Sequence, residues 1–470
     1  MPRVMGVDSS TQSCKVIVRD AATGEELSAG RSAHPAGSEV DPEHWWVALN
    51  AAIEQAGGLA GIDAVSIAGQ QHGMVALDSE GRVIRPALLW NDTRSAEAAQ
   101  DLITEIGLAE LVRRTGSVPV ASFTATKLRW LRDHEPDNAA RVAAVCLPHD
   151  WLTWRLRGYG PSGEAKLGPD LDELITDRSD ASGTSYFSAS ANAYDRQVLA
   201  IALGHDAALP RVLKPAEAIA GPGFLVGPGA GDNASAALGL DARDGDTVVS
   251  LGTSGTVFAT TATPSHDPSG YVAGFADATG GYLPLVCTLN AARVLDSIAG
   301  LLGVDHDELG RLALQAAPGA GGAVLVPYFE GERTPNLPSA TASLVGLSLE
   351  STTRPNLARA AIEGMLCGLS AGVDALRELE VSLARVMLIG GAAANPAVAA
   401  IAAQVFDLPV VVPEPGEYVA DGAARQASWV LTGERPTWPV RLTAAPLSDP
   451  RPIIAEQYRA AASRYLNPGS

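Results

Sequence analysis

The sequence has little cysteine and a deficit of basic residues. Its four cysteines lie far apart and form no CxxC pair, at positions 14, 146, 287 and 367. This spacing does not support a zinc ribbon or a redox motif and favours a reducing, cytoplasmic compartment. The 34 basic residues stand against 53 acidic ones, for a net charge of −19. Such a charge repels nucleic acid and anionic membranes, so neither is expected as a partner.

Long apolar runs and several common catalytic motifs are also absent. No run approaches the ~18 to 20 apolar residues that a membrane helix requires, and the opening MPRVMGVDSS lacks the layout of a signal peptide. We therefore expect a protein that neither spans a membrane nor is exported by that route. The motifs HExxH, GxSxG, GxGxxG and GxxxxGK[ST] do not occur in an interpretable context.

What the sequence does contain is one hairpin pattern written twice. VMGVDSSTQSCKVIVRD begins at position 4 and VVSLGTSGTVFATT at position 248, about half the chain apart. Both run from a strand through a Ser/Thr-rich turn into a second strand. At 470 residues the chain is long enough for two cores. The repetition predicts two similar α/β domains, 1–240 and 241–470.

Other elements follow from apolar periodicity and capping. We expect strands at 3–8, 15–19 and 64–69, and a helix from Pro42 capped by Asp41. Helices are expected to dominate 96–157, and a long amphipathic helix to follow Arg354. The acidic stretch DLDELITDRSD, 170–180, is interpreted as solvated surface.

The two Ser/Thr-rich turns are candidate phosphate sites, because hydroxyls and backbone N–H groups converge there. Thr11 lies in the first turn, and Thr253 and Ser254 lie in the second. Asp8 is a candidate Mg²⁺ ligand, directly or through water, and Lys15 a candidate partner of a phosphate oxygen. A single turn of this kind is usually just a turn, and it is the repetition of the pattern that favours a phosphate site.

Polar residues that follow predicted strands are candidates for the sugar side of a site. Asp232, in GAGDNASAALGL, is either the N-cap of a helix or a general base, and Asn233 offers a donor and an acceptor to hydroxyl groups. Gln71 and His72 follow the strand 64–69, although His72 could be an ordinary loop histidine. In the nearby WNDTRS, we expect an ion pair between residues 92 and 94.

A glycine pair in the second half has two interpretations as well. Gly390 and Gly391 separate a strand from a helix, and Asn395 precedes the helix as its N-cap. The pair either makes a tight turn or lets a flat base lie against the backbone.

Taken in order along the chain, these segments resemble the FGGY family of carbohydrate kinases, and within it the xylulokinase group. The resemblance rests on GVDSSTQSCKV, IAGQQHGMVALD, RPALLWNDTRS, SDASGT, GAGDNASAALG, VSLGTSGTVF, YFEGERTP and LIGGAAAN. It implies two ribonuclease-H-like α/β domains, as in actin, hexokinase and the Hsp70 ATPase, around an interdomain nucleotide cleft. It also implies ATP, Mg²⁺ and a homodimer.

The resemblance also implies roles for individual residues. Asp232 matches the catalytic base and Asp8 the metal-side carboxylate; His72, with Gln71, matches the sugar-binding pair. On the nucleotide side, Thr11 and Thr253 match phosphate-contacting hydroxyls, and Gly391 and Asn395 match positions at the adenosine end. Lys15, Ser254 and Gly390 are nucleotide-binding candidates from their places in the turns described above. Two positions depart from the family: the first turn is DSST where DxGT is common, and Gln71 replaces a frequent Met.

The implied activity is phosphorylation of D-xylulose to D-xylulose 5-phosphate. The alternatives within the family are L-ribulose, L-xylulose and glycerol as acceptors. An actin-like ATPase without a sugar substrate is the alternative from another class.

Overall fold

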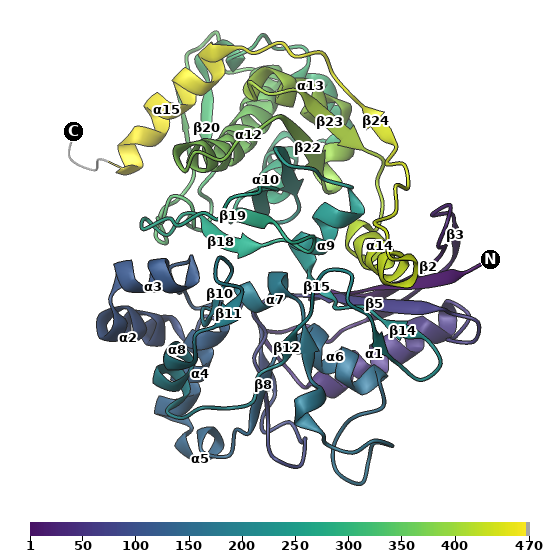
Figure 1. Cartoon of the computed structure of the whole chain (residues 1–470). Coiled ribbons are helices and arrows are strands. Elements are labelled where there is room, and N and C mark those ends of the chain that lie inside the picture. The colour runs from purple at the N-terminus through teal and green to yellow at the C-terminus, as the bar shows by residue number, and fades with distance from the viewer. Residues whose placement is uncertain (467–470) are drawn as a thin grey trace. The chain divides into compact units, whose positions relative to one another are not determined.

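The structure is a computed structural model that describes residues 1–466, arranged as two compact units of α/β type (Figure 1). The first unit comprises Met1–Ala242, Ala262–Leu283 and Glu417–Pro439. The second comprises Arg243–Thr261, Pro284–Gly416 and the described residues from Val440 onward. Within the described part of the chain, no helix is long and apolar enough to cross a membrane.

The first unit is built on a mixed sheet in the order β13-β14-β5-β1-β2-β3, with β15 also pairing with β5. β1 and β2 form the first predicted hairpin, and β3 extends it antiparallel. β5 runs parallel to β1, and β14 and β15 both run parallel to β5. The bounds are β1 Arg3–Ser9, β2 Ser13–Asp20, β3 Glu26–Ala33, β5 Ala64–Gly69, β13 Ile219–Ala220, β14 Leu225–Val226 and β15 Ala230–Gly231.

Helices and short strand pairs surround this sheet. The helices of the unit are α1 Pro42–Gln55, α2 Ala96–Ile106, α3 Leu108–Thr115, α4 Thr124–His134, α5 Pro136–Ala139, α6 Pro148–Leu156, α7 Arg178–Ser182, α8 Arg196–Leu203, α9 Asp232–Gly239 and α14 Tyr418–Thr432. The short strands are β4 Glu39–Val40, β6 Val75–Leu77, β7 Ala87–Leu88, β8 Ala144–Cys146, β9 Ile175–Thr176, β10 Phe187–Ser188, β11 Ala193–Tyr194, β12 Arg211–Val212 and β18 Ala273–Ala276.

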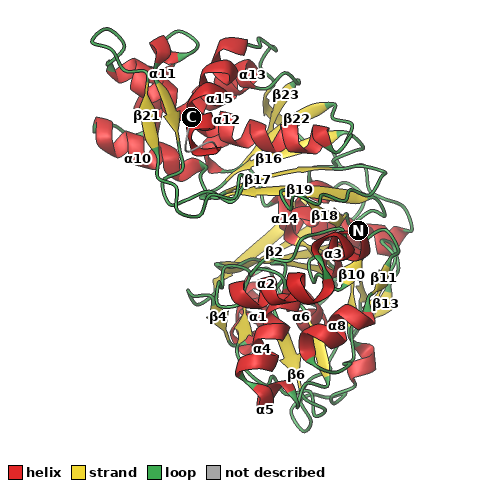
Figure 2. Ribbon diagram, turned by 90° about the vertical axis from the view of Figure 1, so that its left-hand side faces the viewer, coloured by secondary structure: helices red, strands yellow, loops and turns green. Residues whose placement is uncertain are grey.

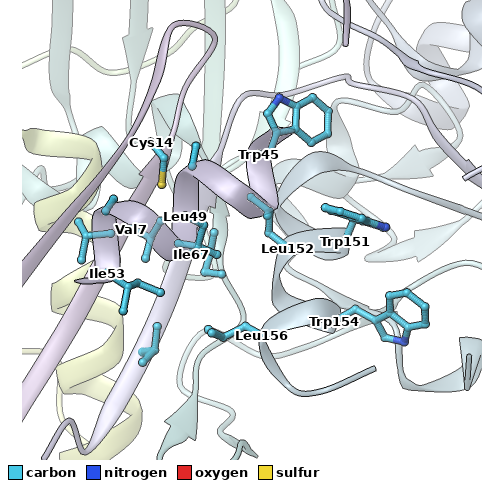
Figure 3. Packing of buried hydrophobic residues seen from close by; sticks show 14 of the residues in the cluster. Val7, Cys14, Trp45, Leu49, Ile53, Ile67, Trp151, Leu152, Trp154 and Leu156 are labelled. Atoms are coloured by element: carbon cyan, nitrogen blue, oxygen red, sulfur yellow. The ribbon is translucent and has the colours of Figure 1, made fainter. Parts of the chain in front are cut away.

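One face of the first sheet carries the main apolar core. Alternate residues of the strands, such as Val7 and Ile67, point toward α1 and α6, as the period of two requires. Trp45 and Leu49 of α1 and Trp151 of α6 fill the space between the layers (Figure 3). All five are almost completely buried, and burial of one such side chain stabilises the fold by ~1.5–3 kcal/mol.

The opposite face of the same sheet is covered by α14, which comes from near the C-terminus. Val4, Ile17 and Ala64 pack there against Ala420 and Ala424 of this helix. In Figure 1 the yellow α14 lies beside the purple strands β1 and β2. A helix more than 400 residues from Val4 in sequence therefore completes the core of the N-terminal sheet.

The second unit repeats the strand order of the first. Within this unit the strands of its sheet run in the order β19-β17-β16-β22-β23-β24, with β16 and β17 as an antiparallel hairpin and β22 parallel to β16. The hairpin predicted at half-length is thus confirmed, together with the two-domain α/β fold. The strands are β16 Asp246–Leu251, β17 Gly255–Ala259, β19 Tyr282–Thr288, β20 Val324–Val326, β21 Ser343–Val345, β22 Arg385–Ile389, β23 Val410–Pro413 and β24 Leu442–Ala444.

The long helix expected after position 354 is confirmed as α12, Arg354–Glu378, which packs on β17 (Figure 2). The other helices of the unit are α10 Ala292–Leu302, α11 His306–Ala313, α13 Pro396–Val405 and α15 Pro452–Leu466. The strand expected at 64–69 matches β5, and Asp41 caps α1 as predicted by accepting a hydrogen bond from the Glu43 amide.

Candidate active site

The carboxyl ends of three neighbouring strands form one polar edge in the first unit. Asp8, near the end of β1, pairs in register with Ala68 of β5, and Ala68 pairs with Ala230 of β15. The residues that follow β5 are Gln70, Gln71 and His72, and Asp232 follows β15 directly. Ligands of open α/β sheets bind outside the carboxyl ends of the strands. The fold therefore brings the predicted sugar-side residues and Asp8 to one edge.

Asp8 is a buried carboxylate with limited compensation. Its side chain accepts a hydrogen bond from the Ser10 hydroxyl, and its Oδ2 lies 3.6 Å from the Lys15 ammonium. Burial raises the pKa of Asp8, while Ser10 and Lys15 lower it and the Glu417 carboxylate raises it further. A cation at this carboxylate would relieve the cost of keeping it charged.

Thr11 and Lys15 of the first turn both have partners that sequence reasoning did not anticipate. The Trp90 indole donates to the Thr11 hydroxyl at 2.8 Å, and that hydroxyl donates to Gln70 at 3.3 Å. The Lys15 ammonium lies 2.5 Å from Glu417 Oε2. Lys15 therefore links Asp8 to the residue that precedes α14.

Asp232 is the first residue of α9, and the N-cap position belongs to Gly231, so the N-cap interpretation of Asp232 is wrong by one residue. Its Oδ1 accepts hydrogen bonds from the amide and side-chain nitrogens of Asn233, each at 2.8 Å. The Asn233 side chain also approaches Gln71 Oε1 at 3.5 Å. Burial raises the pKa of Asp232 to about 7, with Asp8 adding repulsion. A carboxyl with such a pKa accepts a proton readily near neutral pH.

His72 is held in a defined orientation beside these residues. Its Nδ1 lies 2.6 Å from the Gly183 carbonyl, which can only accept, so Nδ1 carries the proton. The ring packs against Phe123 and Phe275 of the same unit. The backbone of His72 has a φ of 71°, in the left-handed region that non-glycine residues seldom adopt. Such an orientation is typical of a side chain placed for binding.

The prediction of a solvated acidic loop at 170–180 is wrong for its second half. Asp177 and Asp180 are buried; Asp177 caps α7, and Asp180 contacts His149. In the same helix, the Ser179 hydroxyl accepts from the Gly231 amide and the Ser179 carbonyl accepts from Gln71. The segment supports the polar edge from behind. The predicted ion pair between Asp92 and Arg94 is confirmed at 2.9 Å.

In the second unit, the turn between β16 and β17 exposes Thr253 and Ser254. Gly252 before them has its carbonyl bonded to the Ala292 amide, which fixes the turn against the start of α10. Exposed hydroxyls on a fixed turn are suited to contact an anion.

The glycine pair of the second unit contains two different environments. Gly390 has a φ of 94°, and a Cβ there would lie 2.6 Å from the Leu251 backbone, so only glycine fits. Gly391 is exposed, with open space where its Cβ would be. Asn395 caps α13 through its Oδ1, and its Nδ2 donates to the His306 carbonyl. Of Gly390, Gly391 and Asn395, it is therefore Gly391 that has an unobstructed face for a flat ligand.

Two family models together cover most of the chain. Residues 3–239 match the N-terminal domain of the FGGY family of carbohydrate kinases, and residues 247–431 match its C-terminal domain. The chain belongs to the FGGY family of carbohydrate kinases. It is therefore a carbohydrate kinase, an enzyme that uses ATP to phosphorylate a carbohydrate.

Individual relatives agree with this placement in the FGGY family. The chain is 46% identical to a xylulose kinase of Streptomyces coelicolor over 92% of its own length and 89% of that protein. It is 46% identical to a xylulose kinase of Streptomyces rubiginosus, over 93% and 89%. Among solved structures, a xylulose kinase from Bifidobacterium adolescentis matches with a TM-score of 0.91 and 46% identity, over 98% of this chain and 99% of that one.

Proposed function

We propose that this FGGY kinase transfers the γ-phosphoryl group of ATP to the 5-hydroxyl of D-xylulose. The choice of sugar is supported by relatives named xylulose kinases at 46% identity along more than nine-tenths of the chain. The observation that carries the mechanism is Asp232, a buried carboxylate with a pKa raised to about 7 that accepts hydrogen bonds from Asn233. It stands where three strands present their carboxyl ends.

In the proposed step, the sugar lies against His72, Gln71 and Asn233, which orient its hydroxyl groups. The 5-hydroxyl gives its proton to Asp232 as the oxygen forms a bond to the γ-phosphorus. The bond from that phosphorus to the β,γ-bridging oxygen breaks, and ADP leaves with the electron pair. Because phosphoryl transfer requires little covalent help, positioning and electrostatics supply most of the acceleration.

Several residues are proposed to contact the nucleotide. Thr11 and Lys15 of the first unit, and Thr253 and Ser254 of the second, are proposed to contact phosphate oxygens. Gly390, Gly391 and Asn395 are proposed to border the adenosine end, with Gly391 offering the open face described above.

Asp8 fits a role as the carboxylate that holds Mg²⁺, directly or through water. It is buried with a raised pKa, and Glu417 and Asp232 lie close enough to add negative potential while Lys15 supplies the opposing charge. A hard divalent cation suits such an oxygen-rich, undercompensated site. When bound there, Mg²⁺ would neutralise charge on the β- and γ-phosphates.

The setting of the enzyme is also proposed. Four free cysteines fit a reducing cytoplasm, and a homodimer follows from the family resemblance alone. Light scattering of the purified protein tests the second point.

The experiment that tests the activity is ADP release from Mg-ATP with D-xylulose, L-ribulose, L-xylulose, glycerol or no sugar. We expect the highest kcat/KM with D-xylulose, and a loss of at least ~100-fold in kcat for Asp232→Ala. Asp137→Ala, at an exposed aspartate of α5, is the matched control and should behave as wild type. A preference for another acceptor would overturn the choice of sugar, and near-normal turnover by Asp232→Ala would remove Asp232 as the base.

A further inference from the structure

Three titratable side chains lie completely buried behind the polar edge, and none has a part in the proposed transfer. They are His149 and Asp150, in the first turn of α6, and Asp180 of α7, each at most 1% exposed. Burial of charged groups is costly unless they are paired. The presence of three titratable groups in the core therefore needs a physical explanation.

The two carboxylates lie on either side of the imidazole. His149 Nδ1 lies 2.5 Å from Asp180 Oδ2, and Nε2 lies 3.3 Å from Asp150 Oδ1 and 3.3 Å from the Pro228 carbonyl. Both ring nitrogens thus face acceptors, as in an imidazolium that donates on both sides. Burial lowers the pKa of His149, but the carboxylates of Asp150, Asp180 and Asp177 together outweigh it and raise the pKa above its usual value.

A metal ion is a poor alternative at this cluster. The candidate ligand atoms lie within 4.8 Å of one another, as a metal centre requires. However, ligands at ~2.0–2.2 Å around one ion stand ~3 Å or more apart, whereas His149 Nδ1 and Asp180 Oδ2 are 2.5 Å apart. That separation is a hydrogen bond between the two groups, so the cluster is an ion-paired triad.

The triad contacts the backbone on both sides of the polar edge. A Cβ at Gly229 would lie 2.3 Å from His149 Cδ2, so the turn before β15 rests directly on the ring. A Cβ at Gly69, the last residue of β5, would lie 3.0 Å from His149 Cβ. Gly69 leads to Gln71 and His72, and Gly229 leads to Asp232.

A second connection runs through α7. Asp180 is adjacent to Ser179, whose hydroxyl accepts from the Gly231 amide at 3.1 Å and whose carbonyl accepts from Gln71 Nε2 at 3.3 Å. The ion pair between His149 and Asp180 therefore fixes the helix that bonds both to the residue before Asp232 and to Gln71.

We propose that His149 is a positioning residue for phosphoryl transfer: as an imidazolium held between Asp150 and Asp180, it fixes the Pro228 to Gly231 turn and Ser179, and through them Asp232 and Gln71. The inference rests on the proposed function insofar as Asp232 is the base. A displacement of a reacting group by about 1 Å costs on the order of 100-fold in rate, so a positioning group need not contact the sugar to control kcat.

The test compares His149→Gln with wild type in the sugar-dependent assay, using the best acceptor of the sugar panel. We expect kcat per folded enzyme to fall ~10- to 100-fold, while KM for ATP stays within about twofold of wild type. Trp151→Phe, a change at a buried side chain of the same helix, is the control for lost core packing. It should lower Tm without lowering kcat at a temperature well below Tm.

Wild-type kcat in folded His149→Gln, or an equal loss of kcat in Trp151→Phe, would overturn the inference. Should His149→Gln fail to fold, kcat of Asp180→Asn is measured in its place, with the same loss expected and a wild-type kcat counting against the proposal. A spectrum of the unaltered enzyme provides the second test. In ¹⁵N-histidine-labelled wild type at pH 8, both ring nitrogens of His149 should carry protons, and a neutral ring contradicts the proposal. Failure of the proposed function shows separately, as absence of any sugar-dependent turnover in wild type.

Discussion

At the scale of single residues, Asp232 combines a chemical use with a cost to stability. Its pKa is raised from 3.8 to about 7 by burial, so the folded protein holds the proton more tightly than the unfolded chain. A raised carboxyl pKa means that the unfolded state loses the proton first. The free energy of unfolding therefore falls as pH rises from about 4 to about 7 and stays lowered above that.

Replacement of Asp232 by asparagine should remove this cost. We expect Asp232→Asn to lose sugar-dependent turnover yet to have a higher Tm than wild type at pH 8, by a few degrees, corresponding to roughly 1–2 kcal/mol. The difference should shrink as the pH of the melt is lowered toward 4.5. A Tm difference that is the same at every pH would show that ionisation of Asp232 is not its source.

Lys127 is a buried lysine that we expect to affect sugar binding through the backbone of His72. Its amino group donates to the Ser122 carbonyl and, at 3.4 Å, to the His72 carbonyl, which also accepts from the Thr124 hydroxyl at 3.1 Å. Burial lowers the pKa of Lys127 to about 7, with Asp92 acting in the opposite direction. These donors fix the backbone of His72 in its left-handed conformation.

Lys127→Met keeps the volume and removes one of these donors. KM for the sugar should rise several-fold, with kcat and KM for ATP nearly unchanged. In a His72→Ala background the same change should no longer affect KM for the sugar, because the two residues act as a unit. Lys166→Met, at an exposed lysine, is the control; full additivity of Lys127→Met and His72→Ala would count against the link.

At the scale of elements, α14 is held at its closest approach by glycines. A Cβ at Gly422 of α14 would lie 1.8 Å from the Ser235 carbonyl oxygen of α9, and one at Gly239 of α9 would lie 2.0 Å from the Tyr418 carbonyl oxygen. A Cβ at Gly6 of β1 would likewise lie 2.1 Å from the Ala420 carbonyl oxygen. The helix therefore lies on its neighbours backbone against backbone.

A single methyl group should separate these elements. Gly422→Ala is expected to destabilise the protein by about 3 kcal/mol, since close-packed backbone cannot relax as a side chain can. The measurement is a denaturant or thermal unfolding curve. Gly300→Ala, within α10 where nothing lies within 4 Å of the added atom, should instead stabilise by ~0.5–1 kcal/mol. Equal effects of the two changes would refute the packing argument.

Elements whose signal is local were predictable from the sequence, and contacts between distant elements were not. The strand 64–69, the Asp41 cap and both hairpins depend on periodicity and turn residues within a few positions. The covering of β1 by α14 depends on partners more than 400 residues away. Neither segment has a sequence pattern that indicates its contact with the other.

The residues of the polar edge also include some that were predictable from the sequence and some that were not. The places of Asp8 at the end of a strand and of His72 just after one were predictable, because an apolar run precedes each of them. The short strand β15 before Asp232 was not, because a glycine-rich turn precedes that residue in the sequence. The ion pair of Lys15 with Glu417 spans 402 positions and has no local signal. The acidic residues at 170–180 favoured the prediction of an exposed surface loop. His149, which compensates the charge of Asp180, lies 31 positions away, so the segment itself gave no sign of burial.

At the scale of the whole molecule, the first unit does not end where the first family domain ends. The N-terminal family model stops at residue 239, but Glu417–Pro439 belongs to the same compact unit as β1 and β5. Without that segment, Val4, Ile17 and Ala64 would face water instead of the alanines of α14. A domain cut from the sequence at residue 242 would lack one layer of its core.

A fragment of residues 1–242 should therefore fail to unfold cooperatively. We expect a broad thermal transition and weak near-ultraviolet circular dichroism, as in a protein that has lost specific packing. The same fragment joined through a flexible Gly/Ser linker to residues 417–439 should recover a sharp transition. A cooperative, highly stable 1–242 fragment would show that α14 is dispensable for this unit.

The return of the chain through α14 also fixes an order of events during synthesis. The ribosome delivers the N-terminal strands first, but the helix that covers them emerges only when Pro439 has been made. At ~5–20 residues per second, the nascent sheet waits many seconds with one apolar face uncovered. The unit that begins first is thus among the last parts of the enzyme to be finished.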